Sequence, residues 1–76
     1  MWLPQKEYKR LGKLLKAARL QAGLYQTDVA KRLRKPQSFV SGYESGQRRI
    51  DVFEFIRISG VVEADPIEML KQLVGK

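Results

Sequence analysis

The chain has 76 residues, of which 15 are Lys or Arg and eight are Asp or Glu, so its formal net charge is +7. A chain this short holds one domain with a modest core and little room for an active-site cleft. It contains no Cys and no His, which excludes disulfides, thiolate or imidazole metal sites and the commonest general base. We therefore expect no enzymatic activity, cofactor, metal or small-molecule substrate. A single domain at residues 6–76 should follow a short tail at 1–5.

The positive charge is confined to one part of the chain. Residues 1–49 contain twelve basic and three acidic residues, a net charge of +9, whereas residues 50–76 contain three basic and five acidic residues, a net charge of −2. A local positive field attracts polyanions, with nucleic acid the first candidate and an anionic membrane the second. A generally solvated surface is the alternative explanation. Without a membrane-spanning run of about 18 apolar residues or a signal-peptide pattern, we expect a cytoplasmic protein with no membrane partner.

Two amphipathic helices are predicted in the first half of the sequence. Residues 6–23 place apolar side chains at helical spacing, namely Leu11, Leu14, Leu15 and Ala18. Gly23 is suited to end this helix in a left-handed conformation. Residues 25–33 predict a second helix of about two turns, with Asp28 near its positive end.

A third helix is predicted between Pro36 and Gly46, which suit the first turn and the end of a helix. Val40 and Tyr43 are three residues apart and should face the core. The remaining positions form a polar face of small side chains, namely Gln37, Ser38, Ser41 and Gly42. Such a face lets a helix backbone approach the floor of the DNA major groove.

Two more helices are predicted by their start signals. Asp51 and Glu54 form a capping-box pattern before a fourth helix, which Gly60 and two valines weaken at its end. Asp65 and Pro66 open a fifth helix. Its predicted apolar stripe consists of Ile67, Leu70, Leu73 and Val74. Helices joined by two- to five-residue links place the chain in the all-α class.

The pair at 25–33 and 36–46 has the pattern of a helix-turn-helix, two short helices with a tight turn between them. Around it the sequence resembles the phage-repressor-like (Xre/Cro-type) helix-turn-helix family. The matching marks, within about residues 10–74, are Arg19, Gly23-Leu24-x-Gln26, Ala30 and Ser41-x-Tyr43-Glu44-x-Gly46. The resemblance implies a compact five-helix, lambda-repressor-like domain that binds double-stranded DNA and regulates transcription, as a repressor, by reading the major groove with its third helix.

Four positions depart from the family pattern. Arg34 stands where the family usually has a turn glycine, and Glu63 stands where a glycine often follows the fourth helix. Tyr25 and Pro36 replace Ser or Thr residues that usually cap the second and third helices. These differences concern the turns and leave the predicted helices unchanged.

The candidate site residues fall into three groups. Base-reading residues are Gln37, Ser38, Ser41 and Gly42, and phosphate-binding residues are Gln26, Lys35, Arg48 and Arg49. The resemblance implies that Gln26 braces Gln37 and that Arg19 and Glu44 form a buried structural ion pair. Solvated side chains are the alternative for the polar and basic residues, and Ser41 can instead bond to its own helix. Phe39 either contacts a thymine methyl group or covers the turn.

Three other functional classes were weighed. An enzyme would need an activated nucleophile, and the serines have no His partner. A protein-interaction module, such as an antitoxin or a partner-binding regulator, can use the same fold. An RNA binder would favour exposed aromatic side chains for stacking, and Phe39 alone lies near the site. We expect a homodimer, because two-fold pairing places recognition helices about 34 Å apart and the fifth helix has surplus apolar residues.

Overall fold

The computed structural model describes residues 5–75, and these form five helices and no strand. The helices are α1 (Gln5–Gln21), α2 (Gln26–Leu33), α3 (Gln37–Ser45), α4 (Val52–Val61) and α5 (Pro66–Val74). The five-helix, all-α class predicted from the sequence is therefore confirmed. The predicted tail at 1–5 lies outside the described residues except for Gln5, which is already part of α1.

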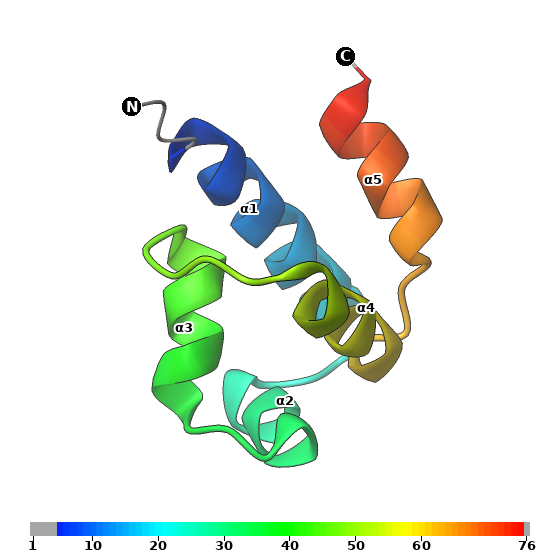
Figure 1. The fold of residues 1–76 in the computed structure, drawn as a ribbon. Coiled ribbons are helices and arrows are strands. Elements are labelled where there is room, and N and C mark those ends of the chain that lie inside the picture. The colour runs from blue at the N-terminus through cyan, green and yellow to red at the C-terminus, as the bar shows by residue number, and fades with distance from the viewer. Residues whose placement is uncertain (1–4, 76) are drawn as a thin grey trace.

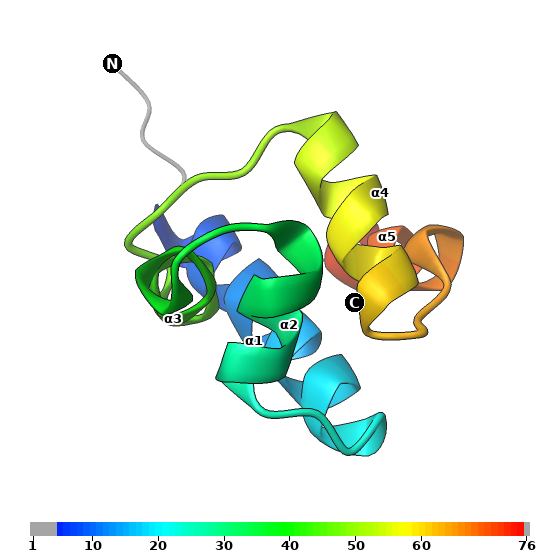
Figure 2. The ribbon, with the colours of Figure 1, turned by 90° about the horizontal axis from the view of Figure 1, so that it is seen from below.

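The longest helix, α1, runs between α3 on one side and α5 on the other (Figure 1). The turned view again shows α3 and α5 on opposite sides of the molecule (Figure 2). α2 and α3 pack against each other across the turn at 34–36, which is the helix-turn-helix arrangement. No helix within residues 5–75 has the length and apolar character needed to cross a membrane.

The core lies where the first four helices meet, and α5 closes one side of it. Leu15 of α1, Val29 of α2 and Val40 of α3 have no exposed surface. Helix α1 approaches α3 closely at Gly12, where a Cβ atom would overlap main-chain carbonyl groups of α3. A glycine is therefore required at this crossing, because any larger residue would push the two helices apart.

The predicted helix ends are confirmed at the capping residues. Gly46 has a φ of 81° and ends α3. The Asp51 carboxylate accepts a hydrogen bond from the Glu54 N–H at 2.7 Å, and the Glu54 carboxylate accepts one from the Asp51 N–H at 2.9 Å. Asp65 caps α5 by accepting from the Ile67 N–H at 2.9 Å. These bonds satisfy donors that a helix start leaves unpaired.

The four positions that depart from the pattern of the resembling family lie at helix ends. Arg34 and Glu63 have φ values of 57° and 59°, in the left-handed region that favours glycine. Tyr25 and Pro36 make no side-chain cap, and at α2 the Asp28 carboxylate instead accepts from the Tyr25 N–H at 2.8 Å. Arg34 and Glu63 thus adopt a backbone conformation that glycine would adopt with less strain.

The apolar stripe predicted for α5 is largely exposed, and of its four residues Leu73 is partly buried. The α5 residue that enters the core is Met69, whereas Ile67, Leu70 and Val74 are 59%, 44% and 81% exposed. A rotation of the helix by one residue exchanges the buried and exposed sets, because neighbouring residues point about 100° apart. In α4, Phe55 and Ser59 are buried, as is Val62 directly after the helix, whereas Val52 and Ile56 are exposed.

Candidate nucleic-acid interface

The polar face of α3 is open to solvent. Gln37, Ser38 and Ser41 are exposed, while Val40 and Tyr43 are buried on the opposite side of the helix. The Ser41 hydroxyl donates to the Ser38 carbonyl oxygen at 3.3 Å, so it bonds to its own helix in the free protein. Its lone pairs stay available to an external donor. The helix thus presents a narrow edge of small polar side chains.

Gly42 differs from the other three predicted base-reading residues because it is partly covered. Its carbonyl oxygen accepts from the N–H groups of Gln47 and Arg48 at 3.0 and 3.1 Å. A Cβ atom on Gly42 would lie 3.1 Å from the Cβ atom of Arg48. Gly42 therefore lets the loop after α3 fold back against the helix.

Beneath this edge, Arg19 of α1 is paired with Glu44 of α3. The Arg19 Nε and Nη2 atoms donate to the two carboxylate oxygens at 2.7 and 3.1 Å, and the Arg19 Nη1 atom donates to the Leu24 carbonyl oxygen at 2.9 Å. Both side chains are buried, at 7% and 3% exposure. The hydrogen bond to Glu44 raises the pKa of Arg19, which stays charged.

Two glutamines connect this buried ion pair to the protein surface through hydrogen bonds. The Gln26 Nε2 atom donates to the Glu44 carboxylate at 2.9 Å, and the Gln37 Nε2 atom donates to the Gln26 Oε1 atom at 3.2 Å. The Gln37 amide keeps one N–H donor and its oxygen acceptor free. One donor and one acceptor are what bidentate binding to adenine N7 and N6 requires.

The predicted phosphate-binding cations lie in the turn before α3 and in the loop after it. Lys35, Arg48 and Arg49 are exposed. The Arg48 guanidinium carbon lies 4.6 Å from the centroid of the Phe39 ring, and the Arg49 guanidinium carbon lies 6.0 Å from the centroid of the Tyr8 ring. Phe39 is only 6% exposed, so the structure favours its packing role. Lys35 and Arg48 thus lie near Ser38, and Gln26 lies next to Gln37, whereas Arg49 lies beside α1 at the end of α3.

Several contributing residues were missed in the sequence. Tyr8 lies near Arg49, and Gly12 sets the distance between α1 and α3, although a lone glycine in an amphipathic helix is a signal for close packing. The Tyr43 hydroxyl is buried with no hydrogen-bond partner among the described residues, and burial raises the pKa of Tyr43. Within residues 5–75 no cluster of metal-ligating side chains was found.

A family model described as Helix-turn-helix matches residues 15–69, which is more than half of the chain. The chain belongs to the Xre/Cro-type helix-turn-helix family. Members of this family are DNA-binding transcriptional regulators and not enzymes. A comparison with curated proteins found no match.

Solved structures with the same fold include an XRE-family like protein from Pseudomonas syringae pv. tomato str. DC3000. It is 43% identical with a TM-score of 0.81, and the match covers 90% of this chain and 83% of that one. The restriction-modification controller protein C.AhdI from Aeromonas hydrophila is 25% identical with a TM-score of 0.77, covering 84% and 97%. The controller C.Esp1396I, solved as a tetramer with its natural 35 base-pair operator, is 20% identical with a TM-score of 0.77, covering 90% of both chains.

Replacing Glu44 should damage folding before it damages DNA selection. Glu44→Ala leaves the buried Arg19 charge without its main partner, so we expect the free energy of unfolding to fall by about 3–5 kcal/mol in chemical denaturation. The control is Glu68→Ala, because Glu68 forms an exposed pair with Lys71 at 3.4 Å and its loss should cost less than about 1 kcal/mol. A Glu44→Ala protein as stable as the parent, but unable to select its duplex, would contradict this structural role.

Proposed function

We propose that the protein binds double-stranded DNA with sequence specificity and regulates transcription, with α3 lying in the major groove. The observation that carries the proposal is the exposed Gln37 amide, oriented through Gln26 by the buried Glu44 carboxylate. A side chain held in one orientation loses little entropy on binding and can discriminate between bases.

The proposed roles divide the interface into base and phosphate contacts. Gln37, Ser38 and Ser41 read base edges, and Gly42 keeps the helix slim where Arg48 lies against it. Phosphate contacts come from Gln26, Lys35, Arg48 and Arg49, which flank α3. Phosphate contacts set the position and orientation of a protein on the duplex, while base contacts supply specificity.

We further propose that the protein represses transcription in the cytoplasm. Repression needs only occupancy of a promoter by a bound domain, and the proposed DNA-binding interface supports that role. A protein-interaction module is the second candidate, and the exposed Phe53 side chain, at 80%, is the observation that favours it. Binding to duplex DNA distinguishes the two, because an interaction module would show neither sequence preference nor a steep salt dependence.

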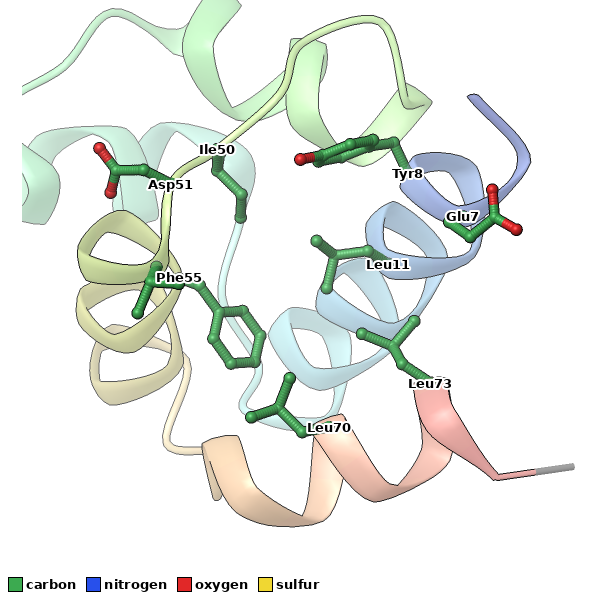
Figure 3. A pocket seen from close by; sticks show the side chains of 9 residues that line it. Glu7, Tyr8, Leu11, Ile50, Asp51, Phe55, Leu70 and Leu73 are labelled. Atoms are coloured by element: carbon green, nitrogen blue, oxygen red, sulfur yellow. The ribbon is translucent and has the colours of Figure 1, made fainter. Parts of the chain in front are cut away.

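The proposal includes a homodimer formed through α4 and α5. Val52, Phe55, Leu70 and Leu73 help to line an apolar cavity of about 380 Å³ between these helices and α1 (Figure 3). Leu70 also lines a neighbouring hollow with the exposed Ile67 and Val74. Contiguous apolar surface of this kind marks interaction sites.

A second copy suits this surface for reasons of charge and position. Helices α4 and α5, which form most of this surface, belong to the part of the chain with a net charge of −2, so the surface does not compete with α3 for DNA. It also lies on the side of the molecule opposite α3 (Figure 2). Pairing through it leaves both recognition helices free to enter successive turns of the groove, about 34 Å apart.

Selection of bound duplexes from a random pool tests the DNA-binding proposal. We expect one preferred sequence with two related half-sites and an affinity that falls steeply with salt. Gln37→Ala should lower discrimination at one adenine by about 1–3 kcal/mol. Gln21→Ala, on the exposed end of α1, is the matched control and should select the same sequence as the parent. A parent protein that enriches no sequence would reject the proposal.

Sedimentation without DNA tests the dimer. The parent should sediment as a dimer at high micromolar concentration, and Leu70→Glu should shift it to a monomer because a charge at an apolar interface is costly to desolvate. Leu20→Glu is the control, since Leu20 is a 59% exposed leucine on α1 that lines neither cavity. A monomeric parent, or equal effects of the two variants, would contradict the proposed interface.

A further inference from the structure

We propose that Lys35 and Arg48 bind one and the same phosphate of the DNA backbone, and that Phe39 is the positioning residue that holds both cations there. The inference rests on the proposed DNA-binding function and defines one site within it. The three residues come from the turn before α3, from the first turn of α3 and from the loop after it. Their order in the sequence does not reveal that they meet.

The Phe39 ring is the shared contact of the two cations. The Lys35 Nζ atom lies 5.5 Å from the ring centroid, and the Arg48 guanidinium carbon lies 4.6 Å from it. Cations within about 6 Å of an aromatic face are attracted by its quadrupole. The ring itself is buried and packs edge-on against Tyr43, with 5.6 Å between ring centroids and 78° between planes. It is therefore a rigid support for two flexible side chains.

The main chain directs Arg48 toward this ring. Its N–H donates to the Gly42 carbonyl oxygen at 3.1 Å, and its Cβ and Cδ atoms lie within 3.1 and 3.7 Å of where a Cβ on Gly42 would be. The side chain thus lies along the surface of α3 and extends back to Phe39 in the first turn. A cation held in this way is pre-organised, which reduces the entropy lost on binding.

The two cations line a common cavity with the chemistry of an anion site. Lys35, Arg48, Phe39, Ser38 and Pro36 line an open hollow of about 250 Å³. The set offers two cationic donors and a hydroxyl group, with no carboxylate among the lining residues. Charge-assisted hydrogen bonds from Lys and Arg are the usual means of binding phosphate. A phosphate would also offset the repulsion between two positive charges near one ring.

The carboxylate of Glu54, which lies near Arg48, does not prevent phosphate binding. The Glu54 carboxylate lies 3.9 Å from the Arg48 Nη2 atom, and the two side chains are 28% and 48% exposed. Exposed ion pairs at such distances are weak, so a phosphate can replace Glu54 as the partner of Arg48. Because Ser38 borders the same cavity, the bound phosphate would fix the depth at which α3 enters the groove.

Single charge removals in the DNA test whether the phosphate is shared. Versions of the selected duplex, each with one methylphosphonate linkage, are titrated with the parent, Lys35→Ala and Arg48→Ala. We expect a methylphosphonate at one linkage per half-site to weaken DNA binding by the parent protein by about tenfold. Each of the two substitutions should weaken binding to unmodified DNA by a similar factor. At that linkage, the loss of affinity caused by a substitution and the loss caused by the methylphosphonate should not multiply. Each substitution has already removed a partner of the same phosphate.

Two further variants separate positioning from general structure. Phe39→Leu keeps an apolar side chain in the core but removes the aromatic face. This variant should bind DNA more weakly, and a methylphosphonate at the same linkage should no longer reduce its affinity. A merely structural role would weaken binding to every duplex by the same factor and leave that sensitivity intact. Lys16→Ala, an exposed lysine of α1, is the control and should keep the full sensitivity of the parent.

The outcomes distinguish this inference from the proposed function. If Lys35→Ala and Arg48→Ala lose sensitivity at two different linkages, or at none, the shared phosphate is wrong while DNA binding stands. If Phe39→Leu keeps the sensitivity of the parent, the positioning role is wrong. A parent protein that binds no duplex overturns the inference and the proposed function together.

Discussion

The buried ion pair between Arg19 and Glu44 is the interaction on which the exposed edge of α3 depends. It joins α1 to α3 through two hydrogen bonds of 2.7 and 3.1 Å in a site with almost no water access. The same carboxylate accepts from Gln26, and Gln26 accepts from Gln37. A buried charge tolerates little displacement, because losing its partner is costly. The orientation of the surface amide is therefore set from within the core.

The molecule separates two kinds of surface. The basic, polar surface surrounds α3, and the apolar surface lies on α4 and α5, with α1 between α3 and α5 (Figure 1). The first belongs to a stretch with a net charge of +9 and the second to a stretch with −2. The proposed contacts with a polyanion and with a second copy therefore use different faces of the molecule.

Much of the fold follows from local signals in the sequence. Helix starts at Asp51 and Asp65 and the helix end at Gly46 depend on neighbouring residues only, so the sequence predicts them. The rotation of α5 depends on how the helix meets the core. Both Met69 and Leu70 satisfy a helical period, and the sequence cannot decide between them. The left-handed backbone conformation of Arg34 could be predicted only from the family pattern, which usually has a glycine at this position.

In the candidate site, too, some features can be predicted from the sequence and others depend on tertiary packing. The resemblance implies the contact between Gln26 and Gln37 and the pairing of Arg19, because a family motif encodes relations between distant residues. No motif predicts that Arg48 reaches back over Phe39, since that contact depends on the path of a loop. Tertiary geometry of this kind was visible only in the structure.

Amide chemical shifts recorded while the selected duplex is added to the labelled protein test the central claim most directly. The account predicts that the largest changes occur at residues 35–41, at Gln26 and at Arg48, with smaller changes in the rest of the chain. Large changes confined to residues 52–56 and 67–74, with α3 unaffected, would contradict it.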